Sequence, residues 1–198
     1  MSEVVLLRTG TANLASVAAA LRRAGAEVRL SDSADDAAGA ERLVLPGVGA
    51  FGAVVEQIDA LGLRSSLVER ITAGRPTLAI CLGLQVLAAG SEESPGADGL
   101  GVIPAKATAL PPDVRSPQLG WNRVTASSRC NLLCDGVAYY ANSYKLDAIP
   151  DGWDGALTDH GGRFVAAVER GPVLACQFHP ELSGAWGQGL VERWLEAV

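Results

Sequence analysis

Positive charge is scarce and scattered in this sequence. Sixteen Lys and Arg residues stand against 22 Asp and Glu residues, which gives a formal net charge of −6 at pH 7. Proteins that bind nucleic acid carry a concentrated basic surface, because phosphate contacts dominate their affinity. We therefore expect no nucleic-acid partner.

Long apolar runs are also missing. Hydrophobic residues make up 48% of the chain, yet no stretch approaches the roughly 20 residues that cross a bilayer as a helix. The segment from Met1 to Arg8 has no basic stretch and only a short apolar run, unlike a signal peptide. We expect no membrane partner and a cytoplasmic location.

Cysteine and histidine are few, with four Cys and two His residues. The cysteines are irregularly spaced in a chain expected to be cytoplasmic, which predicts free thiols rather than disulfides. Cys130 and Cys134 have a spacing that would let them face each other on a helix, but no second pair of ligands accompanies them. We therefore expect no metal and no other cofactor.

What the sequence does have is an alternation of short apolar segments with helical patterns. Charged residues are only 19% of the chain, so residues 1–198 are expected to fold as a single domain around a sizeable core. Helical faces begin at Leu14 and recur between residues 54 and 71. Strands are predicted at residues 4–7, 27–30, 42–45 and 76–81. This order predicts an α/β fold with an open, mostly parallel sheet and flanking helices.

The pattern changes after Gly90. A helix over residues 82–89 is expected to end at this glycine. Earlier in the chain, residues 31–39 are expected to be a polar connection. Further short strands are predicted at residues 101–110, 118–125, 137–144, 164–168 and 172–178. The last two are expected to pair through the turn at Arg170, which makes the second half an antiparallel addition to the sheet. A final helix closes the chain.

One segment, residues 76–90, runs from a buried strand directly into a helix at Cys81. A residue on such a turn is held in strained backbone and exposed at the sheet edge, with Gly83 leaving room for the bend. The positive end of the following helix stabilises a thiolate, and the amide of Leu82 points where an oxyanion would form. The pattern indicates a nucleophilic cysteine. The alternative is that Cys81 is one more small buried hydrophobic residue.

Two other segments carry candidate chemistry. Residues 46–52 are rich in glycine and follow a strand, so backbone N–H groups could approach a ligand there, although a plain tight turn fits as well. Near the C-terminus, Pro180 restricts His179 to extended backbone, in which His179 and Glu181 share a face. Glu181 is then placed to orient the imidazole as a base. The alternative is a surface histidine next to a loop glutamate, or a buried histidine whose polar groups are satisfied by backbone. The other histidine, His160, is expected to be a solvated turn residue.

Taken together, Cys81-Leu82-Gly83 with Gln85 and His179-Pro180-Glu181 resemble the class I (triad) glutamine amidotransferases. Within this family the chain is most similar to the branch that supplies ammonia to the cyclase of imidazole glycerol phosphate synthase. The matching stretches are residues 10–14, 45–51, 76–87, 118–122, 142–144 and 177–184. Arg8, Thr9, Ala79, Asn142 and Leu182 depart from the usual residues of that branch.

The resemblance implies a role for each matching residue. Cys81 would attack L-glutamine to form a thioester, while His179 transfers protons and Glu181 orients it. Groups for an oxyanion hole would come from Val48 or Gly49 and from Leu82. Glutamine would be bound by Gln85, Asn142, Ser143 and Tyr144. Ammonia would pass to a separate (β/α)₈ cyclase subunit in a heterodimer.

Two alternatives remain open. The chain could serve another class I amidotransferase, such as the glutaminase of pyridoxal phosphate synthase, although residues 46–51 and 118–122 argue against this. It could also be a catalytically silent scaffold of the same fold, which an intact set of Cys81, His179 and Glu181 disfavours.

Overall fold

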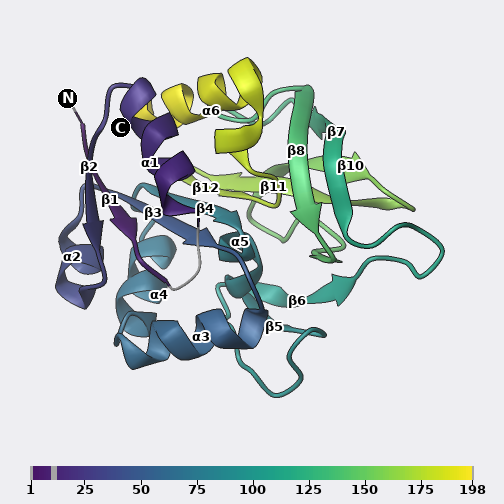
Figure 1. Ribbon diagram of the computed structural model, residues 1–198, viewed down its shortest axis with the longest axis horizontal. Coiled ribbons are helices and arrows are strands. Elements are labelled where there is room, and N and C mark those ends of the chain that lie inside the picture. Colours follow the sequence, from purple (N-terminus) through teal and green to yellow (C-terminus); the bar gives the residue numbers. More distant parts are fainter. Residues whose placement is uncertain (1, 10–12, 198) are drawn as a thin grey trace.

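The computed structural model describes residues 2–9 and 13–197. A nine-stranded sheet runs through the molecule, with helices on both of its faces (Figure 1). In spatial order its strands are β2 (Glu27–Ser31), β1 (Glu3–Leu7), β3 (Arg42–Gly47), β4 (Thr77–Cys81), β12 (Val173–Cys176), β11 (Arg163–Arg170), β10 (Asp154–Asp159), β7 (Gln118–Ala126) and β8 (Gly136–Asn142). A smaller sheet contains β5 (Ala88–Ser91), β6 (Ile103–Ala109) and β9 (Tyr144–Lys145).

The direction of pairing changes once across the large sheet. From β2 to β12 all neighbouring strands are parallel, and from β12 to β8 all are antiparallel. The predicted parallel half and the antiparallel addition are therefore both confirmed. Strand β12 joins them, since it is parallel to β4 and antiparallel to β11.

Alternate side chains of the parallel strands enter two separate cores. Leu43 and Leu45 of β3 pack under α3 (Phe51–Ala60) and α4 (Arg64–Thr72). Val44 points to the other face, where α1 (Leu14–Arg23) and α6 (Gly184–Glu196) lie together (Figure 1). Because strands buried on both faces need apolar residues at every position, the short continuous apolar runs of the sequence follow directly.

The elements differ from the expectations in four places. The segment after β2 contains a short helix, α2 (Ala34–Gly39), whose first turn is capped by Ser33 and carries Asp35 and Asp36. The helix after Cys81 is only α5 (Leu82–Val86), because Ala88 to Ser91 pair with β6 as a strand. Strand β10 was not predicted, and the strand expected at residues 137–144 is divided at Ser143 into β8 and β9. Of the matching stretch at residues 10–14, residues 10–12 lie outside the described residues, as does Val198.

No helix of the described residues is long and apolar enough to cross a membrane.

Candidate active site

Cys81 sits at the junction of β4 and α5 in strained backbone. Its φ is +54°, and no other non-glycine residue in the described ranges has a positive φ. Such a conformation costs energy for a residue with a Cβ and is typical of functional sites. Gly83 permits the bend, because a Cβ there would lie 2.3 Å from the carbonyl oxygen of Leu45. The predicted strand–turn–helix geometry at the cysteine is thus observed.

His179 reaches the same sheet edge from the segment after β12. Its Nδ1 lies 2.8 Å from Oε1 of Glu181, and both side chains are almost fully buried. The contact was predicted, but the reason given for it was wrong. His179 itself is extended, with φ −100° and ψ 97°, whereas Pro180 to Leu182 form a short 3₁₀ helix, so the pair does not share one extended face. The backbone of His179 is held by a hydrogen bond to the carbonyl of Tyr139, on strand β8.

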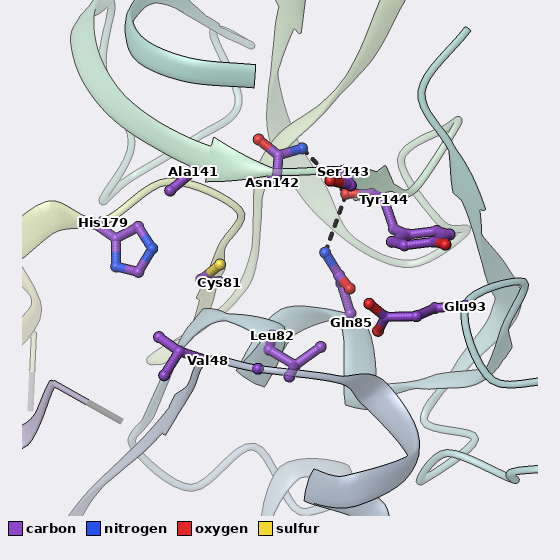
Figure 2. Close-up of a pocket in the computed structure, with 11 residues that line it drawn as sticks. Val48, Cys81, Leu82, Gln85, Glu93, Ala141, Asn142, Ser143, Tyr144 and His179 are labelled. Atoms are coloured by element: carbon purple, nitrogen blue, oxygen red, sulfur yellow. Dashed lines mark hydrogen bonds between the residues drawn. The ribbon is translucent and has the colours of Figure 1, made fainter. Parts of the chain in front are cut away.

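The surroundings of His179 favour its charged form. Burial by itself lowers the pKa of the imidazole, but hydrogen bonds to Cys81 and Glu181 outweigh burial and raise the pKa from 6.5 to about 10. Because Nδ1 is engaged with Glu181, the ring nitrogen available to the thiol is Nε2. Figure 2 shows the imidazole beside the sulfur of Cys81. A thiolate facing an imidazolium is the arrangement that activates a cysteine nucleophile.

These groups open into a cavity of about 260 Å³. Nine of the ten residues predicted for the site line it, and Glu181 lies behind His179. The lining residues are Val48, Gly49, Cys81, Leu82, Gln85, Glu93, Ala141, Asn142, Ser143, Tyr144 and His179 (Figure 2). The cavity has room for an amino acid, and the described residues of its wall carry only one carboxylate, that of Glu93.

The segment that carries Val48 is fixed against the Cys81 turn. Gly47 is the last residue of β3 and is paired with Cys81, and a Cβ on Gly47 would lie 2.8 Å from the amide nitrogen of Gly83. The hydroxyl of Thr9 donates to the carbonyl of Pro46 over 2.9 Å. Gly49 has φ +99°, a conformation that favours glycine. The glycines are therefore used for close approach and for a left-handed turn next to the cavity.

The predicted glutamine-binding residues form a hydrogen-bonded wall opposite. Nε2 of Gln85 donates to the carbonyl of Tyr144 and to Oε1 of Gln177, each over 3.0 Å. Nδ2 of Asn142 donates to the same Tyr144 carbonyl over 3.1 Å. Since both N–H groups of the Gln85 amide are engaged, its oxygen is the group that this side chain can offer to a ligand.

Sequence reasoning missed three residues of the site. Glu93 lines the cavity and also accepts a hydrogen bond from the amide of Phe51, at the start of α3, over 2.6 Å. Ala141 contributes to the wall. Gln177, which is fully buried, donates to the sulfur of Cys81 over 3.7 Å. A polar run at residues 91–94 and the position of Gln177 two residues before His179 were the available signals.

Within the described residues, no group of three or more His, Cys, Asp or Glu side chains is arranged to hold a metal ion. Nε2 of His160 lies 2.8 Å from the carbonyl of Arg115, on an exposed turn away from the cavity.

Comparisons with known proteins find similar chains over the full length. The family model described as "Glutamine amidotransferase class-I" matches residues 5–196. The protein named "Imidazole glycerol phosphate synthase subunit HisH" from Deinococcus radiodurans is 43% identical, over 96% of this chain and 91% of that protein. The protein of the same name from Renibacterium salmoninarum is 40% identical, over 100% of this chain and 95% of that protein.

Solved structures agree on the fold. A structure titled "Crystal structure of glutamine amidotransferase" superposes with a TM-score of 0.78 at 22% identity, and the match covers 98% of this chain and 97% of that one. A glutamine amidotransferase from Thermotoga maritima superposes with a TM-score of 0.62 at 17% identity, and that match covers 99% of this chain and 81% of the other.

Proposed function

The chain belongs to the class-I glutamine amidotransferases. We infer from its relatives of 40% and 43% identity that it is the glutaminase subunit of an imidazole glycerol phosphate synthase. It hydrolyses L-glutamine and supplies the ammonia for a step of histidine biosynthesis. The observation that carries the catalytic proposal is the strained Cys81 beside a buried, Glu181-bound imidazole in an amino-acid-sized cavity.

We propose the following chemistry for this site. The Cys81 thiolate attacks the carboxamide carbon of glutamine, and the His179 imidazolium gives its proton to the departing nitrogen as the C–N bond breaks. Ammonia and a γ-glutamyl thioester result. Neutral His179 then takes a proton from water, whose oxygen attacks the thioester, and the Cys81–carbon bond breaks to release glutamate. The thiolate and the imidazolium are both restored.

Both tetrahedral intermediates carry a negative oxygen that needs hydrogen-bond donors. The amide of Leu82, at the start of α5, lies on the cavity wall next to the nucleophile. The segment of Val48 and Gly49 lies on the same wall and is anchored through Pro46. We propose that backbone N–H groups from these two segments form the oxyanion hole.

Charge and hydrogen bonding favour one orientation of glutamine. The Glu93 carboxylate and the oxygen of Gln85 suit its α-ammonium group, because both are acceptors in a largely buried site. Asn142, Ser143 and Tyr144 line the same part of the cavity and would contact the α-carboxylate end through their polar groups. The carboxamide would then extend toward Cys81. A glutamine bound in this way presents its reacting carbon to the sulfur.

The names of the relatives describe one subunit of a synthase, and the exposed surface suggests where the other subunit binds. Leu119 and Trp121 of β7 are 61% and 59% exposed, and Val137 of the paired strand β8 is 46% exposed. Leu182, directly after Glu181, is 39% exposed. We call these four residues the apolar edge. Contiguous exposed apolar patches mark sites of protein–protein interaction. We propose that a (β/α)₈ cyclase subunit covers the apolar edge and receives the ammonia.

The direct test is glutamate release by the purified chain, alone and with the cyclase subunit. We expect hydrolysis that depends on Cys81 and is raised by the cyclase. Cys81→Ala should abolish hydrolysis, while the variant complex still forms product from ammonium salts. Near-normal hydrolysis by Cys81→Ala would overturn the mechanism, and equal hydrolysis with and without the cyclase would remove the case for this partner.

A further inference from the structure

Gln177 contacts the proposed nucleophile and has no role in the catalytic mechanism above. The residue follows β12, and no part of it is exposed. Its Nε2 donates to Sγ of Cys81 over 3.7 Å, within the longer range of hydrogen bonds to sulfur. The sulfur therefore has two polar neighbours, His179 and Gln177.

The orientation of the Gln177 amide is determined by its other neighbour. Its Oε1 accepts from Nε2 of Gln85 over 3.0 Å, and that nitrogen also donates to the carbonyl of Tyr144. Rotating the Gln85 amide would place its oxygen against two acceptors. Rotating the Gln177 amide would place its nitrogen against a donor and its oxygen against the sulfur. Only the observed arrangement satisfies every group.

We propose that Gln177 is a positioning residue for the glutaminase reaction, which holds the Cys81 sulfur through an N–H donor and links it to the substrate-binding residue Gln85. This inference rests on the proposed function. The hydrogen bonds from Gln85 to Gln177 and from Gln177 to Cys81 then couple glutamine binding to the nucleophile. A ligand that orders Gln85 also orders Gln177 and hence the sulfur.

The donor matters most when the sulfur is anionic. A hydrogen bond to a charged atom in a buried site is stronger than one between neutral groups. Gln177 therefore stabilises the sulfur most whenever it is a thiolate, which includes the moment when the thioester breaks down and the Cys81–carbon bond is lost. When the sulfur is acylated and neutral, the same contact is weak. The predicted effect is on kcat, with KM for glutamine changed little.

Alkylation of Cys81 by iodoacetamide as a function of pH reports on this contact directly. The thiolate is the reacting form, so loss of a stabilising donor moves the rise of the rate to higher pH. Cys134 is exposed and Cys130 is half-buried, so both can react as well, and the reaction is followed by mass spectrometry of the peptide that contains Cys81. The variants are Gln177→Met, which keeps the length without a donor, and Gln85→Leu, which removes the anchor of Gln177 and leaves the Gln177 donor in place. Thr158→Val is the control, a buried hydroxyl lost away from the cavity.

In Gln177→Met the midpoint of the alkylation profile should rise by roughly half to one pH unit, the effect of about one lost hydrogen bond. Gln85→Leu should shift the midpoint less in the same direction. The double variant should match Gln177→Met, because the anchor has no effect once the donor is gone. Thr158→Val should leave the midpoint in place. In the complex with the cyclase, kcat of Gln177→Met should fall about tenfold.

An unchanged midpoint in Gln177→Met would overturn the inference, whatever happens to activity, because a structural role alone would not move the profile. If Gln177→Met does not fold, an unchanged midpoint in Gln85→Leu overturns it instead. Additive shifts in the double variant would refute the link between the two residues. Failure of the proposed function is a separate result: the wild-type chain would then release no glutamate with its partner, while the alkylation profile would still report on the sulfur contact.

Discussion

At the scale of single residues, the site depends on a few groups in energetically unfavourable states, namely a strained backbone and a buried charge. Cys81 accepts unfavourable backbone geometry, and His179 is kept charged by partners on both of its ring nitrogens. An imidazole with only one of these partners would be less basic, because burial acts against its charged form. The division of roles between His179 and Glu181 leads to two predictions.

The first prediction concerns how far kcat/KM falls when each of the two residues is replaced. His179→Ala should lower kcat/KM more than Glu181→Gln, because the imidazole moves the proton while the carboxylate orients it. General acid–base catalysis contributes about 10²–10⁴-fold. Steady-state glutamate release, measured in the complex with the proposed cyclase partner, compares the two variants. A loss of less than about tenfold for His179→Ala would place the proton transfer on another group.

The second concerns pH. The pKa of His179 is raised to about 10, so the imidazolium that protonates the leaving nitrogen persists through neutral pH and is lost as pH rises toward 10. The alkaline decline in kcat/KM should therefore lie near pH 10 in the wild type. Glu181→Gln removes one of the hydrogen bonds that raise this pKa, so its decline should begin at lower pH. Coincident alkaline limbs in the two proteins would contradict the assignment.

At the scale of elements, the site is where β3, β4 and β12 end together. Strand β4 is buried between the other two, and their carboxyl ends bring Val48, Cys81 and His179 to one edge of the sheet. Ligand sites of open α/β sheets form at this edge, which explains why residues far apart in sequence meet there. The rigidity of the edge depends in turn on how the strands and helices behind it are held.

Arg70 of α4 forms hydrogen bonds to the end of α2 and to the start of β4. The guanidinium is almost fully buried and donates to the carbonyls of Ala37, Ala40, Glu41 and Pro76 and to the hydroxyl of Thr77. Burial lowers its pKa from 12.5 to about 10, and the charge of nearby Arg75 acts in the same direction. Removing the donors would leave buried carbonyls unpaired around α2 and β4.

Arg70→Met should therefore lower the free energy of unfolding by about 2–4 kcal/mol, the range for breaking a buried hydrogen-bond network. Urea denaturation followed by circular dichroism measures the change. Arg75→Met, which removes a more exposed guanidinium bound to the same end of α2, is the matched control and should cost less. Equal losses of unfolding free energy in the two variants would mean that burial of the Arg70 guanidinium adds nothing to stability.

The elements also show how far the sequence could be read. The Cys81 turn and the glycine segment were predictable, because each is a local pattern with a local cause. The His179–Glu181 contact was expected from a shared extended face, but it forms through the short 3₁₀ helix that begins at Pro180. The end of α5 was not predictable. Residues 87–89 were expected to continue the helix, and they leave it because Ala88 pairs with Ile103 of β6. Glu93 and Gln177 were missed for a similar reason, since their roles depend on which distant segments the fold places beside them.

At the scale of the whole molecule, the cavity and the apolar edge are neighbours. Strand β8 is the last strand of the large sheet, and it carries Val137 while its residue Tyr139 is bridged to His179. A protein bound on the apolar edge would therefore press on the strand that positions the histidine. This proximity gives the proposed partner a physical route to influence hydrolysis.

Trp121→Ala should weaken association with the cyclase at least tenfold, because large aromatic residues contribute most at interfaces. The fold of the chain should be unchanged, since the Trp121 side chain is largely exposed. Leu30→Ala is the control: Leu30 is also an exposed hydrophobic residue, on β2 at the opposite edge of the sheet. Titration calorimetry measures the binding of both variants to the cyclase. Equal binding by Trp121→Ala and the wild type would place the interface elsewhere.

The central claim is that this chain breaks down glutamine through a thioester on Cys81. Acid quenching of the complex during turnover, followed by peptide mass spectrometry, looks for the γ-glutamyl group itself. We predict the adduct on the peptide that contains Cys81, present with glutamine and absent with glutamate. Glutamate release without an adduct on Cys81, or with the adduct on another cysteine, would contradict this claim.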